Sequence, residues 1–219
     1  MEDKETLEYF LSILDEAEHI FTGDVYAEKK PFVEYSLKES ENKTASLSML
    51  DDEPLSVENC RGCQGWRERL KHIPSKIVQN CSVLCIMERP ERLSLLSEKG
   101  EMFFNAWFKG LGIPLERVSL TTLIKCPVSS FSDLYADACK DKLRQEMGLA
   151  NPRVMLLLGE NVARYMTRKN LSIEALRGNV YKINHIPTVV TYSPEDLVRN
   201  YSNLRAPIWS DLQLVKGQL

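Results

Sequence analysis

Four short, largely apolar runs recur along the chain after residue 80, and each is followed by polar or turn-forming residues. They occupy residues 82–87, 118–124, 154–159 and 188–192. Continuous apolar runs of this length are typical of strands that are buried on both faces, as in parallel sheets. The pattern therefore predicts four buried strands, with 154–159 the clearest of them.

The segments between these strands carry apolar residues at helical spacing. They predict helices near 100–110, 133–147, 161–168 and 195–200, and a closing helix that contains Trp209, Leu212 and Val215. Ser132 precedes the second of these segments and is a residue type that caps helix N-termini. Strands that alternate with helices predict an α/β fold, a three-layer α/β/α domain with a mainly parallel central sheet.

The first part of the chain has a different character. Apolar residues at helical spacing predict an amphipathic helix near residues 3–21, and the following residues are rich in Ser, Glu, Asn and Asp. We expect an acidic N-terminal helical arm at 1–35, a polar linker at 36–56, and one domain at 57–219.

Charge is distributed unevenly between these parts. Residues 1–58 hold 5 Lys and Arg against 16 Asp and Glu, a balance of −11, whereas residues 59–219 hold 23 against 15, a balance of +8. The net charge of −3 therefore hides a basic domain, which is compatible with nucleic-acid binding. No apolar run of about 18 residues predicts a membrane span, and the acidic start lacks a signal core. We expect a cytoplasmic protein with reduced thiols.

Four cysteines have a spacing that suits a metal site. Cys60 and Cys63 form a Cys-x-x-Cys pair, and Cys126 and Cys139 follow far downstream. Four thiolates can hold either a zinc ion or an iron–sulfur cluster, and the residues alone do not distinguish the two. The other two cysteines, Cys81 and Cys85, flank or lie in the first strand, so we expect them to be small core residues.

In open α/β sheets, ligands bind at the carboxyl ends of the strands. Here these ends are residues 88–90, 122–126, 159–160 and 192–194. Neither a Gly-x-Gly-x-x-Gly loop nor a Gly-x-x-x-x-Gly-Lys-Ser/Thr loop follows the first strand, which disfavours a nucleotide-binding α/β protein.

Several motifs at these positions resemble one family in order and spacing. They are Cys60-x-x-Cys63 with Arg69, the stretch Thr121-Thr122-Leu123-Ile124-Lys125-Cys126-Pro127, Ala138-Cys139, Leu158-Gly159 with Ala163, Leu176-Arg177-Gly178, Thr191-Tyr192-Ser193-Pro194 with Leu197 and Arg199-Asn200, and Trp209-Ser210-Asp211-Leu212-Gln213. Over residues 57–215 the chain resembles the family 4 uracil-DNA glycosylases and their phage-polymerase-associated relatives. The resemblance implies a [4Fe–4S] cluster on the four cysteines, with zinc as the less favoured alternative.

The resemblance also implies a base-excision pocket, in which this chain departs from the family at several positions. The family's Gly-Glu-x-Pro-Gly loop is here Met87-Glu88-Arg89-Pro90-Glu91, so both glycines are replaced. A stacking Phe corresponds to Leu95, a base-reading Asn to Thr122, and a His to Ser193. By analogy, Glu88 and Ser193 are the candidate catalytic residues, and Leu95 and Thr122 would contact the base.

Two hypotheses follow from this partial match. In the first, the protein is a DNA glycosylase that removes uracil or another deaminated base through an altered pocket. In the second, it is a catalytically impaired relative that binds DNA or a repair or replication partner. In both, Arg69, Arg199 and Arg205 are candidate DNA contacts, the acidic arm is a candidate site for a protein partner, and the protein is a monomer without a membrane partner.

Overall fold

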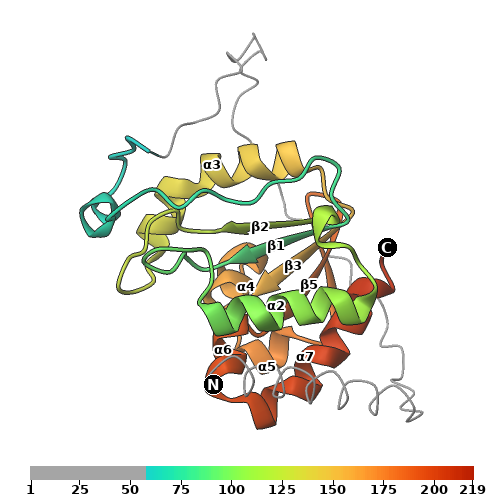
Figure 1. Cartoon of the computed structure of the whole chain (residues 1–219). Coiled ribbons are helices and arrows are strands. Elements are labelled where there is room, and N and C mark those ends of the chain that lie inside the picture. The colour runs from blue at the N-terminus through green and yellow to red at the C-terminus, as the bar shows by residue number, and fades with distance from the viewer. Residues whose placement is uncertain (1–57) are drawn as a thin grey trace.

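A computed structural model describes residues 58–219, so the predicted arm (1–35) and linker (36–56) lie outside the described residues. A single five-stranded sheet has the strand order β2-β1-β3-β5-β4 (Figure 1). Its strands are β1 (Val83–Met87), β2 (Val118–Thr122), β3 (Val154–Leu158), β4 (Val180–Ile183) and β5 (Ile186–Thr191). The first four strands in this order pair in parallel, and β4 pairs with β5 in antiparallel orientation at the edge.

Helices cover both faces of the sheet (Figure 1). One face packs against α3 (Asp133–Ala150), α4 (Glu160–Thr167) and α5 (Ile173–Leu176), and the other against α2 (Glu98–Leu111), α6 (Pro194–Arg199) and α7 (Tyr201–Lys216). Side chains of β1 alternate between the two faces: Leu84 and Ile86 join the first core cluster, and Val83 and Cys85 join the second. The predicted three-layer α/β/α class is confirmed.

Most of the expected elements are present with shifted ends. The predicted strand 118–124 ends at Thr122, and the predicted last strand begins earlier, at Ile186. Ser132 caps α3, because its hydroxyl accepts a hydrogen bond of 3.3 Å from the Leu134 amide. Cys81 and Cys85 are both 0% exposed, which confirms them as core residues.

The hairpin of β4 and β5 was absent from the expected elements. Asn184 and His185 form its turn with positive φ angles of 50° and 65°, the backbone region that two-residue hairpin turns require. The exposed His185 is therefore a turn residue. Two 3₁₀ turns, η1 (Gln64–Glu68) and η2 (Leu115–Arg117), complete the described elements. Across residues 58–219, no helix has the length and apolar character that crossing a membrane demands.

Candidate functional site

The carboxyl ends of β1, β3 and β5 meet at one edge of the sheet, because these strands are parallel and neighbouring. The β1–β2 pairing continues past the strands, since the amides of Leu123 and Ile124 donate hydrogen bonds to the carbonyls of Met87 and Glu88 at 2.7 and 2.9 Å. Between β3 and α4 the chain turns at Gly159, whose φ of 98° suits glycine. This turn places the start of α4 beside Ser193, whose Cβ lies 3.8 Å from the position of a Cβ at Gly159.

The four predicted metal ligands are brought together from three segments. Cys60, Cys63, Cys126 and Cys139 line one small cavity next to η1, with Lys125 and Lys142 also in its wall. Cys126 and Cys139 are buried, whereas Cys60 and Cys63 are partly exposed. The two local and the two distant cysteines thus line the same cavity, and their role as metal ligands stays a prediction.

Several local contacts suit a thiolate site. The Gly62 amide donates a 3.5 Å hydrogen bond to Cys60 Sγ. Burial works against ionisation of Cys60, yet the Gly62 amide and the Lys142 ammonium lower its pKa. Gly65 packs so closely that an added Cβ would lie 2.8 Å from Val128 Cγ1 and 3.7 Å from Cys126 Cβ. Four sulfur donors with supporting amide and ammonium groups fit a metal–thiolate centre.

The thiols do not stand in ligating geometry. Among residues 58–219, no three His, Cys, Asp or Glu side chains are grouped closely enough to hold a metal ion.

Lys125 joins this cysteine cavity to the end of β2. Its ammonium, 3% exposed, donates to Thr121 Oγ1 at 2.6 Å, to the Thr122 carbonyl at 2.7 Å, and to Glu146 of α3 at 2.5 Å. Burial lowers the pKa of Lys125, and the Glu146 carboxylate acts in the opposite direction. This buried cation fixes the loop that carries Cys126 against β2 and α3.

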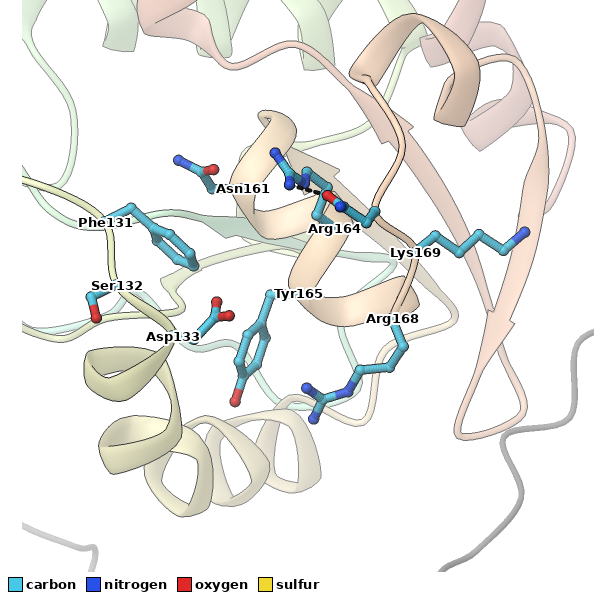
Figure 2. A pocket seen from close by; sticks show the side chains of 9 residues that line it. Phe131, Ser132, Asp133, Asn161, Arg164, Tyr165, Arg168 and Lys169 are labelled. Carbon is cyan, nitrogen blue, oxygen red and sulfur yellow. Dashed lines mark hydrogen bonds between the residues drawn. The ribbon is translucent and has the colours of Figure 1, made fainter.

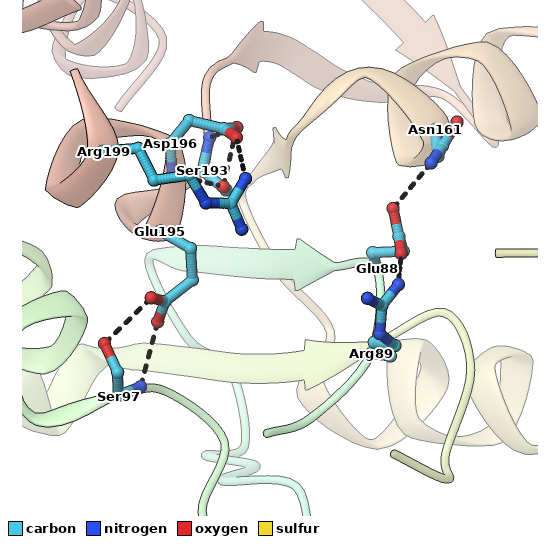
Figure 3. Close-up of polar contacts among 8 residues, drawn as sticks. All are labelled: Glu88, Arg89, Ser97, Asn161, Ser193, Glu195, Asp196 and Arg199. Atoms are coloured by element: carbon cyan, nitrogen blue, oxygen red, sulfur yellow. Dashed lines mark hydrogen bonds and ion pairs between the residues drawn. The ribbon is translucent and has the colours of Figure 1, made fainter. Parts of the chain in front are cut away.

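Two cavities of similar size share Phe131 and Asn161 in their walls. The first, the basic cavity, has a volume of about 580 Å³ and lies against α4 (Figure 2). It is lined by Phe131, Ser132, Asp133, Asn161, Arg164, Tyr165, Arg168, Lys169 and Asn170. The second, the acidic cavity, has about 570 Å³ and lies over the carboxyl ends of β1, β3 and β5 (Figure 3). Its charged lining residues are Glu88, Glu91, Glu160, Glu195, Asp196, Arg89 and Arg199.

Glu88 is held in the acidic cavity from two sides (Figure 3). Its Oε2 accepts a 2.7 Å hydrogen bond from Asn161 Nδ2, and its Oε1 pairs with the Arg89 guanidinium. The Glu88 side chain is 26% exposed. A carboxylate with a fixed orientation and access to solvent can place a water molecule and accept its proton.

Ser193 also lines the acidic cavity, but its hydroxyl serves the start of α6 (Figure 3). Ser193 Oγ donates to Asp196 Oδ2 at 2.7 Å and accepts from the Asp196 amide at 3.1 Å, while Asp196 Oδ2 accepts from the Ser193 amide at 3.0 Å. This is a capping box. The only hydroxyl hydrogen of Ser193 therefore points to Asp196.

The two residues expected to contact the base lie outside the wall of the acidic cavity. Leu95 is partly buried and packs against the core cluster of α2, and Thr122 is 2% exposed at the end of β2. The aromatic rings in that wall are those of Phe131 and Tyr192. A Leu95 contact and a Thr122 contact with a base thus stay predictions.

The three predicted DNA-contacting arginines are separated in the structure. Arg69 Nη2 donates to the carbonyls of Glu58 at 2.7 Å and Cys60 at 3.5 Å, which ties down the start of the cysteine loop. Arg199 lines the acidic cavity and pairs with Asp196 at 3.4 Å. Arg205 is exposed on α7, with its guanidinium 5.9 Å from the centre of the Tyr201 ring. Only Arg199 lies at the cavity itself.

Sequence reasoning missed Phe131 and Asn161, although both face the two cavities. Asn161 follows Gly159-Glu160 at the carboxyl end of β3, so the strand-end rule could have included it. Phe131 lies in the irregular segment between Cys126 and α3, and nothing in the local pattern predicts where that segment folds.

Comparison with known proteins gives matches over most of the chain. The family model of the uracil DNA glycosylase superfamily matches residues 58–213. The chain is 25% identical over 191 residues to a type-4 uracil-DNA glycosylase of Saccharolobus solfataricus, which covers 80% of this chain and 87% of that protein. It is 23% identical over 188 residues to the type-4 uracil-DNA glycosylase of Sulfurisphaera tokodaii, with coverage of 78% and 84%.

Proposed function

The chain belongs to the uracil DNA glycosylase superfamily, and on that premise we propose that it is a base-excision repair enzyme that hydrolyses the N-glycosidic bond of uracil or another deaminated base in DNA. The observation that carries this proposal is the position of Glu88. Glu88 follows the last residue of β1, and its carboxylate faces a cavity of about 570 Å³ and is oriented by Asn161 and Arg89.

The reaction requires a base that has left the stack and entered a pocket. A water oxygen then bonds to C1′, the electron pair of the C1′–N1 bond leaves with the base, and a proton passes from water to Glu88. The carboxylate also stabilises positive charge that develops on the sugar. Phe131 and Tyr192 supply the ring surfaces in the wall, and Arg199 supplies a cation for the departing base.

A specific observation favours the second candidate function, a catalytically impaired relative that binds DNA or a repair partner. The hydroxyl of Ser193 donates its hydrogen to Asp196, so it offers no donor to the departing base without breaking the capping box. An enzyme with this pocket relies on Arg199 or Asn161 for that hydrogen bond.

One assay separates the two candidates. Anaerobically purified protein is incubated with oligonucleotides that contain one uracil or one hypoxanthine, single-stranded or paired, and alkali-labile sites are counted. An enzyme produces such sites on at least one substrate. Retained DNA binding without any alkali-labile site would identify the impaired relative.

The proposed cofactor is a [4Fe–4S] cluster on Cys60, Cys63, Cys126 and Cys139, with zinc as the alternative. Four sulfur donors without oxygen ligands support it, because thiolates favour clusters and zinc. When bound, the cluster would tie η1 and the loop of Cys126 to α3, and so brace the end of β2. Protein made anaerobically should contain about four irons per chain, and Cys126→Ser should lose them and melt at a lower temperature. Protein that contains zinc and no iron would show that the four cysteines hold zinc rather than a cluster.

Two further expectations remain predictions: the protein is a monomer, and the acidic segment 1–35 binds a protein partner. The charge balance of −11 in residues 1–58 supports a basic partner surface.

A further inference from the structure

The charge of the acidic cavity poses a problem for a DNA ligand. Five carboxylates line it (Glu88, Glu91, Glu160, Glu195 and Asp196) against two guanidiniums (Arg89 and Arg199). Such a lining suits a neutral base and a sugar that becomes positive, but it repels phosphates. The phosphates next to an excised base must therefore be neutralised outside the acidic cavity.

The basic cavity has the opposite charge and adjoins the acidic one. Its lining residues include three cations, Arg164, Arg168 and Lys169, and one carboxylate, Asp133. The Lys169 side chain extends away from the other lining side chains (Figure 2), with its ammonium 5.2 Å from the centre of the Tyr181 ring. Arg164 and Arg168 belong to the last turn and the C-cap of α4 (Figure 2). Because the helix C-terminus carries partial negative charge, these cations are also favoured there without a ligand.

The basic cavity contains ring surfaces as well as cations. Phe131, from the segment before α3, and Tyr165, from α4, both line it (Figure 2). The Arg168 guanidinium lies 4.7 Å from the centre of the Tyr165 ring, and Tyr165 Oη donates a 2.7 Å hydrogen bond to Asp137, which fixes the ring. Rings next to cations form the surface on which proteins bind single-stranded nucleic acids.

We propose that the basic cavity binds the nucleotide next to the excised one, in a single strand, with its base against Phe131 or Tyr165 and its phosphate at Arg168. This proposal rests on the proposed function. Phe131 and Asn161 form the wall between the cavities, so consecutive nucleotides of one strand can occupy both.

The shape of the site selects a single strand over a duplex. A cavity of about 580 Å³ has the volume of a small-molecule site, and a nucleotide enters it only after its base has left its neighbours. In a duplex this costs a second unstacking and unpairing step, whereas a single strand pays little. Stacking and phosphate contacts tolerate every base, so the site should add affinity without sequence preference.

Binding of a uracil-free oligonucleotide tests the site separately from base excision. The double variant Arg168→Asn with Lys169→Gln removes two cations, and Asn suits the φ of 56° at position 168. The matched control is Arg117→Gln with Lys216→Gln, which removes two exposed cations from the opposite end of the sheet. Affinity for a single-stranded 12-mer, about one single-strand site in size, is measured by fluorescence anisotropy over a range of salt concentrations.

The double variant should bind about 5-fold more weakly at low salt, and the slope of log K against log[salt] should flatten by about 0.7, the value for one lost phosphate contact. The control should bind as wild type does. A double variant that keeps its melting temperature and binds with wild-type affinity and slope would overturn the proposal. An equal loss on a duplex of the same sequence would overturn the assignment to a single strand.

The two proposals fail in distinguishable ways. If the wild-type protein excises uracil and the double variant binds as the wild type does, the proposed binding site in the basic cavity fails and the proposed glycosylase activity stands. If the wild-type protein excises no base and the double variant binds more weakly, the proposed binding site in the basic cavity stands and the proposed glycosylase activity fails. Phe131→Leu offers a second test, because loss of one stacking ring should weaken single-strand binding by about 5-fold or more.

Discussion

Removal of the Arg177 guanidinium is expected to destabilise the domain far more than loss of an exposed ion pair. Arg177 follows α5 and reaches Asp211 of α7, where Nε donates to Oδ2 at 2.9 Å and Nη2 donates to Oδ1 at 3.1 Å. Thr191, the last residue of β5, donates a further 2.8 Å hydrogen bond to the same carboxylate. This contact fixes the end of β5, which leads directly into the Ser193 loop of the acidic cavity.

The magnitude follows from burial. The Asp211 side chain is 1% exposed, and that of Arg177 is 22% exposed. Removing one partner of a buried pair costs about 3–5 kcal/mol, and partial access of water to this pair places the expected loss near the lower end, about 3 kcal/mol. For a domain of this size, that corresponds to a fall in melting temperature of about 6–12 °C. Burial already raises the pKa of Asp211 against the opposing effects of Thr191 and Arg177, so an unpaired carboxylate is still less favourable.

Arg177→Met keeps the apolar stem and removes the charge, and thermal unfolding measures the effect. The control is Arg144→Met, whose pair with Asp141 at 3.3 Å has both side chains about 70% exposed, and which should cost about 0.5 kcal/mol or less. Adding Asp211→Asn to Arg177→Met should recover stability, because the buried charge is then gone. Equal melting temperatures for Arg177→Met and Arg144→Met, or no recovery in the double variant, would refute the reasoning.

Two smaller predictions concern single hydroxyl groups. Ser193→Ala removes the cap of α6 and should cost about 1 kcal/mol, whereas Ser193→Thr keeps the hydroxyl and should retain most of the stability; equal melting of both variants and the wild type would contradict the capping role. Burial and the Asp137 carboxylate raise the pKa of Tyr165 to about 12 from its usual 10. The folded state thus holds this proton more tightly, and the resulting stability is complete below pH 10 and is lost as pH rises toward 12. Tyr165→Phe should therefore lose less stability over that interval, and an identical pH profile would contradict the shift.

The sequence predicted the elements whose signal is local. The runs of β1 and β3 are apolar on both faces, and Ser132 precedes α3 as a cap should. It missed β4, because Val180–Ile183 is a four-residue edge strand whose positions alternate in burial, and its turn uses Asn184-His185 rather than an Asn-Gly pair. The sequence analysis also missed α5, because this helix is only four residues long.

Site residues could be predicted from the sequence only where a reactive residue type stands at the spacing of a known motif. The four cysteines and Glu88 follow from motifs, and the structure brings the cysteines to one cavity and Glu88 to another. Phe131 reaches both cavities through the path of an irregular loop, which no periodicity encodes. Ser193 has two possible roles, and only the structure shows that its hydroxyl is bonded to Asp196.

The most direct test of the account is the single-turnover rate of uracil release by wild-type protein and by Glu88→Gln, on the same single-stranded oligonucleotide. Glu116→Gln, the same chemical change on exposed η2 at the opposite end of the sheet, serves as the control. Loss of a general base predicts a rate lower by about 10²- to 10⁴-fold for Glu88→Gln, with the control at the wild-type rate. Uracil release by Glu88→Gln at the wild-type rate would contradict the central role of Glu88 in the acidic cavity.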